Sequence, residues 1–190
     1  MSRTQKNVYI ALLAAQAVVI SLIEGLVPNL LAFAPGAKIG LANIVTLVAI
    51  FTLSYKDSFK VVAMRLLLTS LLAGTLSTFM YSFAGSILSY LGMLLVYQLG
   101  PKRVSFIGIS AAGGILFNIG QLAVASLIAQ SFSVMLYLPI LSFAGIIAGV
   151  LVGLIANFMM TNIATIKKMQ SEEARNNKLS RKWYQENIKK

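Results

Sequence analysis

The sequence predicts an all-α integral membrane protein built as a bundle of six transmembrane helices. Two observations carry this prediction. First, 58% of the 190 residues are hydrophobic and only 11% are charged, whereas a soluble domain carries about 25% charged residues. Second, the apolar residues form long stretches near the roughly 20 residues that a helix needs to cross a bilayer. The mean hydropathy of +0.83 agrees with this class.

The six predicted spans are separated by polar or turn-forming segments. These breaks are a Pro-Gly turn, a charged loop, a Gly-containing connection, a Pro-Lys-Arg segment and a polar turn, at 33–38, 56–60, 82–86, 100–104 and 130–135. The spans, which together form a transmembrane domain over residues 1–166, are 8–31, 39–55, 61–81, 87–99, 105–129 and 137–166. The fourth has only 13 residues, so the number of spans needs independent support.

The distribution of basic residues supports six spans. With six, both termini lie on one side of the membrane, and every Lys and Arg except Lys38 falls on that side. Fusing the third and fourth spans would place the Lys102/Arg103 loop and the C-terminal tail on opposite faces. Because connections rich in Lys and Arg stay in the cytoplasm, we expect both termini to be cytoplasmic. Arg65, one turn inside the third span, is expected to reach lipid headgroups there.

Residues 167–190 form a basic tail that holds eight of the 16 Lys and Arg residues. We expect a solvated cytoplasmic tail that is partly helical. Attraction to anionic lipid contributes about 1 kcal/mol per basic residue near the surface and accounts for this charge. Nucleic acid is not an expected partner, because only Trp183 and Tyr184 offer aromatic platforms for bases.

The candidate ligand-binding residues are polar side chains within or beside apolar spans. A charge at the membrane centre costs about 2.5 kcal/mol or more, so such a residue tends to face a cavity or a partner. Four candidates lie at the outer ends of the first two spans, and two lie three positions apart on one face of the fifth. They are Glu24, Asn29, Lys38, Asn43, Asn118 and Gln121.

Two interpretations of these residues stay open. Glu24 and Lys38 form a structural ion pair that closes the first hairpin, or they line a solute cavity open to the outside. In the second case Lys38, or the start of the second helix, faces an anionic group. Asn118 and Gln121 likewise either bond neighbouring helices or face the same cavity. Gly145, Gly149 and Gly153 form a small-residue face that packs within the bundle or against a partner.

The composition argues against most catalytic chemistry. The chain has no Cys and no His, which excludes thiol nucleophiles, Ser-His-Asp triads and His-ligated haem or zinc. Polyprenyl transfer needs clustered aspartates to hold Mg²⁺ on a diphosphate, and Asp57 is the sole Asp. A Gly-rich phosphate loop is also missing. We therefore expect no enzymatic activity and no metal site.

The stretch Pro-Gly-Ala-Lys-Ile-Gly-Leu-Ala-Asn at 35–43 resembles a motif of the bacterial Gx transporter family, also described as heptaprenyl diphosphate synthase component I. The similarity covers about residues 8–166. Size and number of spans also resemble the S components of energy-coupling-factor (ECF) transporters. In those proteins an Ala-xxx-Ala pair in the first helix docks the energising membrane subunit, and Ala11 and Ala15 match that pair.

The resemblance implies a subunit of the bacterial cytoplasmic membrane that captures a vitamin-, flavin- or quinone-related solute at the outer face, with an ECF coupling subunit and ATPases as partners. A second hypothesis is a membrane subunit of flavin- or quinone-linked extracellular electron transfer, with a bound flavin or quinone or an extracellular flavoprotein partner. A third is an accessory component of heptaprenyl diphosphate synthesis.

Overall fold

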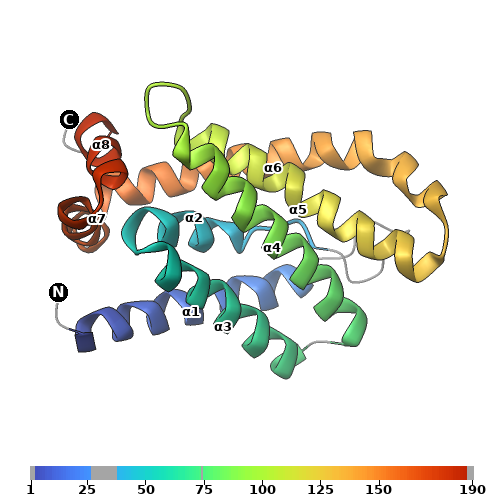
Figure 1. The fold of residues 1–190 in the computed structure, drawn as a ribbon. Coiled ribbons are helices and arrows are strands. Elements are labelled where there is room, and N and C mark those ends of the chain that lie inside the picture. The colour runs from blue at the N-terminus through green and yellow to red at the C-terminus, as the bar shows by residue number, and fades with distance from the viewer. Residues whose placement is uncertain (1–2, 27–37, 74, 188–190) are drawn as a thin grey trace.

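The computed structural model describes residues 3–26, 38–73 and 75–187, and this part of the chain contains helices and no strand. Most of the helices run back and forth along one long axis, and the last two lie across the end of the molecule at which the first helix starts (Figure 1). In chain order they are α1 (Arg3–Leu26), α2 (Asn43–Thr52), α3 (Tyr55–Ala73), α4 (Leu76–Gln98), α5 (Phe106–Ala129), the 3-10 helix η1 (Phe132–Tyr137), α6 (Leu138–Asn162), α7 (Ala164–Asn176) and α8 (Lys178–Asn187).

Four segments of the described chain are long and apolar enough to cross a membrane: α1, α4, α5 and the continuous stretch Phe132–Asn162. This confirms the all-helical, membrane-like class, but not the number of six spans. The helix α3 has 19 residues, enough for about 28 Å. It carries four charged side chains, however, which lowers its hydropathy below that of the other four.

The predicted span 39–55 is not confirmed as a helix that crosses a membrane by itself. The helix α2 has ten residues, about 15 Å, which is half of a hydrocarbon core of about 30 Å. All ten residues are buried, polar Asn43, Thr46 and Thr52 included. The stretch is apolar on every side because other helices surround α2, a pattern that the sequence does not distinguish from contact with lipid.

The predicted boundaries on both sides of the third span differ from the structure. The expected loop 56–60 lies inside α3, and the expected connection 82–86 lies inside α4. The helix α4 begins instead after Thr75, whose side chain accepts a hydrogen bond from the Thr78 N–H in a capping box. The 13-residue span 87–99 is therefore the second half of a 23-residue helix.

The helices α4, α5 and α6 pack closely through glycines. A Cβ atom on Gly120 of α5 would lie 2.6 Å from the Ala84 carbonyl oxygen of α4, and one on Gly149 of α6 would lie 2.6 Å from the Ala111 Cα of α5. Gly145 and Gly153 also face α5. The predicted small-residue face thus packs inside the bundle.

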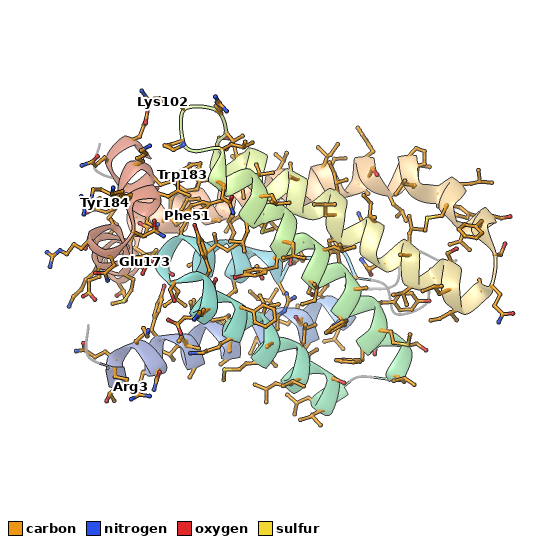
Figure 2. All side chains as sticks on the ribbon, viewed as in Figure 1. Arg3, Phe51, Lys102, Glu173, Trp183 and Tyr184 are labelled. Atoms are coloured by element: carbon orange, nitrogen blue, oxygen red, sulfur yellow. The ribbon has the colours of Figure 1, made fainter. Side chains whose placement is uncertain are left out.

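The tail is not simply solvated. Trp183 of α8 is 1% exposed and stacks on Tyr97 with ring centroids 5.5 Å apart. It also meets Phe51 edge-on at 5.1 Å and Phe106 at 5.6 Å. Figure 2 shows Trp183 and Phe51 together at the end of the bundle that α7 and α8 cover. One aromatic side chain therefore ties the tail to α2, α4 and α5.

Candidate functional site: a buried polar cluster

Glu24 is the centre of a polar cluster enclosed by apolar helices. It lies near the end of α1 and is 5% exposed. Its Oε1 accepts hydrogen bonds from the Gly40 N–H and, at 3.3 Å, from the Leu41 N–H. Gly40 has a φ of +94°, a conformation that side chains other than glycine rarely adopt. The carboxylate thus holds the non-helical segment 38–41 just before α2 begins.

Gln121 of α5 holds the same segment from the other side. Its Oε1 accepts from the Lys38 N–H at 2.7 Å, and its Nε2 donates to the Lys38 carbonyl oxygen at 2.8 Å. The amide therefore pairs with the main chain of Lys38 in both directions, as a neighbouring strand would. The backbone N–H and C=O groups of this non-helical segment thus find hydrogen-bond partners in side chains from α1 and α5.

The Lys38 ammonium does not form an ion pair with Glu24. Its Nζ lies 3.4 Å from the Ser21 carbonyl oxygen, and among the described residues no carboxylate lies within 4 Å of it. Lys38 still interacts electrostatically with Glu24 and with Arg65. The interpretation of a direct pair closing the hairpin is therefore wrong, because the carboxylate is used by backbone N–H groups instead.

Arg65 also belongs to this cluster. Sequence reasoning did not include it among the site residues. It is 4% exposed, donates to the Ser86 hydroxyl of α4 and interacts electrostatically with Glu24. The expectation that it reaches lipid headgroups is wrong, since α3 begins at Tyr55 and Arg65 lies ten residues, about 15 Å, along it. The pattern Ser54-x-x-Asp57, typical of a helix start, could have indicated this.

The remaining predicted residues have different roles. Asn43 is 3% exposed at the start of α2, and its Oδ1 has no hydrogen-bond partner among the described residues. Asn118 donates to the Leu141 carbonyl oxygen of α6 at 2.7 Å, which is the interhelical bond of the structural interpretation. Asn29 lies outside the described residues.

Ala11 and Ala15, the predicted docking pair, are not part of this cluster. They lie nearer the start of α1 than Glu24 does. Both are exposed on α1, whereas the neighbouring Ala14 is 1% exposed and faces the core. Val8 and Leu12 are each more than half exposed on the same helix. The pair therefore lies on an outward, apolar surface of α1 that lipid or another helix can cover.

The cluster carries an imbalance of charge. It holds two cations, Lys38 and Arg65, and one carboxylate, Glu24. Charges inside a membrane protein are usually paired or face a cavity. A net positive cluster with an unpartnered amide oxygen is suited to a solute that offers an anionic or carbonyl group together with a donor.

The fold and this cluster define a multi-helix, membrane-like protein with a charged interior. No group of three or more His, Cys, Asp or Glu that could hold a metal ion lies among the described residues. The model of the family described as heptaprenyl diphosphate synthase component I matches residues 13–159. The chain therefore belongs to that family. The match ends before α7 and α8. No curated protein and no solved structure matches the chain.

Proposed function

We propose that the protein is a membrane substrate-binding subunit of the S-component type, which captures a small vitamin-, flavin- or quinone-related solute at the outer face. The observation that carries the proposal is the cluster of Glu24, Lys38 and Arg65. Its second cation has no carboxylate of its own, and its backbone segment 38–41 is held by side chains rather than by a helix. The proposal places both termini in the cytoplasm of a bacterial cell.

The solute would meet the part-exposed Lys38 before the buried Asn43. The Lys38 ammonium has a carbonyl oxygen as its hydrogen-bond partner, so an anionic or carbonyl group of a solute would be a stronger acceptor. The Asn43 Oδ1 offers an acceptor for a ring N–H or hydroxyl. The described chain has no nucleotide-binding motif, so energy for transport would come from partner subunits.

The exposed pair Ala11 and Ala15 supports this assignment. Small residues let helix backbones approach closely, and the pair lies on the outward surface of α1. A coupling subunit that receives this surface would link solute capture to ATPases. Enlarging Ala11 or Ala15 would block this surface. Enlarging the buried Ala14 is the matched control, because it would disturb the core and not the outer face.

The family's description favours a second candidate, an accessory membrane component of heptaprenyl diphosphate synthesis. Co-purification separates the candidates. An ATPase pair with a membrane coupling subunit supports the first and a prenyl synthase the second. A flavoprotein partner or a bound flavin would support the electron-transfer hypothesis instead.

The direct test is native mass spectrometry with an absorption scan on protein purified in mild detergent. Wild type is compared with Lys38→Ala and Asn43→Ala, and with the exposed controls Lys168→Ala and Asn162→Ala. A small molecule retained by wild type and both controls but lost from the two site variants supports the proposal. A ligand retained equally by all five proteins, or none in wild type after incubation with flavin and quinone, contradicts it.

A further inference from the structure

A second feature lies at the end of the molecule that α7 and α8 cover, where α8 meets the connection between α4 and α5. A cleft of about 690 Å³ opens there. Its lining comes from the end of α4, the connecting loop and one side of α8, namely Leu99, Gly100, Pro101, Lys102, Arg103, Lys182, Gln185 and Glu186. Three cations against one carboxylate give this cleft a net positive charge.

The loop side of the cleft is a closed turn. Gly100 has a φ of +82°, and its N–H donates to the Tyr97 carbonyl oxygen at 3.2 Å. Its own carbonyl oxygen then accepts from the Arg103 N–H at 3.1 Å and the Val104 N–H at 3.3 Å. These bonds fix the backbone that presents Lys102 and Arg103, and both side chains are exposed. Figure 2 shows Lys102 beside α8.

The α8 side is held by contacts on the adjacent face of that helix. The Trp183 indole N–H donates to the Tyr97 carbonyl oxygen at 3.2 Å, and the Ser180 and Tyr97 hydroxyls lie 3.0 Å apart. Because Trp183 is buried, α8 cannot rotate about its axis. Lys182, Gln185 and Glu186, spaced to share one face, are thereby kept toward the loop.

An apolar track leads along α4 to this cleft. Leu91, Leu95 and Leu99 follow one another at four-residue spacing and are 49%, 66% and 50% exposed. Residues at this spacing lie on one side of a helix, and α4 is one of the helices long and apolar enough to span a membrane. The track ends at Leu99, which itself lines the cleft.

From this arrangement we infer that the cleft is a binding site for an anionic phospholipid. The phosphate of the headgroup lies among Lys102, Arg103 and Lys182, and an acyl chain lies along the leucine track of α4. Basic pockets between helix ends at the membrane surface suit anionic headgroups. The adjoining track favours a lipid over free phosphate, since an inorganic ion would make no use of exposed leucines. This site is independent of the solute cluster.

The test measures phospholipid binding to the full chain in detergent by native mass spectrometry, with phosphatidylglycerol and phosphatidylcholine of equal chain length. Wild type should retain phosphatidylglycerol preferentially. The triple variant Lys102→Gln/Arg103→Gln/Lys182→Gln should bind it on the order of a hundredfold more weakly, given the attraction of each cation for anionic lipid. The variant Lys168→Gln/Arg175→Gln/Lys178→Gln removes the same charge from exposed positions outside the cleft and should bind as wild type does.

Three results would overturn the inference. Equal loss in both triple variants would show attraction to net charge and no site. Equal retention of the two lipids by wild type would show no headgroup preference. Displacement of phosphatidylglycerol by millimolar inorganic phosphate would show an anion site without a role for the track.

Folding of the variants is read from Trp183, the single Trp of the chain, whose fluorescence shifts to the red if α8 detaches. Should the triple variant show that shift, the loop variant Lys102→Gln/Arg103→Gln, which leaves α8 unchanged, decides instead. It is expected to lose most of the preference for phosphatidylglycerol with Trp183 still buried.

Discussion

Glu24 shows how one residue can be structural and electrostatic at once. A carboxylate inside an apolar bundle is costly unless it is hydrogen-bonded, and here two backbone N–H groups supply those bonds. The same carboxylate is the negative charge that offsets Arg65 and Lys38. Substitutions that remove the charge but keep the acceptor can separate the two roles.

We expect Glu24→Leu to lower the stability of the protein by about 2 kcal/mol or more, because a buried N–H without an acceptor costs about 1–3 kcal/mol. Glu24→Gln keeps an acceptor oxygen and should lose clearly less. Thermal unfolding in detergent, followed through Trp183 fluorescence, measures both. Equal melting temperatures for the Leu and Gln variants would contradict the role of Glu24 in holding segment 38–41.

Asp57 makes a second charged contact, at the end of the bundle where α1 begins. Burial alone would raise its pKa, but hydrogen bonds from Lys6, Lys60 and Ser54 outweigh burial and hold the pKa below its usual range. The Lys6 and Lys60 ammonium groups lie 2.7 and 2.8 Å from the carboxylate. The contact therefore joins α1 to the first turn of α3.

The lowered pKa of Asp57 predicts a dependence of stability on pH. The folded pKa lies below the unfolded value of about 3.9, so the stabilisation is present above that value and is lost as pH falls through the folded pKa. Wild type should therefore lose melting temperature below about pH 4 more steeply than Asp57→Asn. Melting curves from pH 7 to pH 3 test this, and parallel curves for the two proteins would contradict it.

Sequence reasoning found most of the cluster because polarity in an apolar stretch is conspicuous. Glu24, Lys38, Asn43 and Gln121 all lie within it or border it. Arg65 was missed for a different reason: its depth depends on where α3 begins, and an error of six residues at a helix start shifts a side chain by about 9 Å.

At the scale of elements, a glycine caused one of the errors. Gly85 indicated a break between two spans, but it lies in the middle of α4, where a Cβ atom would meet the Phe117 side chain at 3.0 Å. A glycine that permits a turn and a glycine that permits close helix packing look identical in one sequence. The bounds of α5, by contrast, agree with the predicted span 105–129 to within one residue, because distinct breaks flank this helix on both sides.

Close packing predicts unequal effects for two glycines of the same helix. A methyl group on Gly114 would collide with the Gly145 carbonyl oxygen of α6, whereas one on Gly108 would meet the Ser105 hydroxyl at 3.7 Å, an ordinary contact. We expect Gly114→Ala to cost about 1–3 kcal/mol and Gly108→Ala to be neutral or slightly stabilising. Melting temperatures of the two variants in detergent decide, and similar values would argue against tight contact of α5 with α6.

At the scale of the whole molecule, the arrangement of ends gives a testable orientation. The tail helices α7 and α8 and the start of α1 lie at one end, and η1, which joins α5 to α6, lies at the other (Figure 1). The predicted cytoplasmic side is the end with the tail, because basic connections stay inside.

A chain without Cys allows this orientation to be read with single introduced thiols. Ser133→Cys in η1 and Asn176→Cys in α7 both replace exposed residues. A membrane-impermeant maleimide should label the first in intact cells and the second only after the membrane is opened. The reverse pattern would show that the protein has the opposite orientation. Labelling of both positions in intact cells would show that the two ends do not lie on opposite sides of the membrane.

The placement of Trp183 also has a consequence for biosynthesis. The rings that receive it, those of Phe51, Tyr97 and Phe106, belong to helices that leave the ribosome well before residue 183 does. Until Trp183 emerges, that aromatic recess is open to water and the ends of α2, α4 and α5 lack their common contact. A chain interrupted between α6 and α8 would contain the whole region matched to the family and would still leave these three rings without the side chain that covers them.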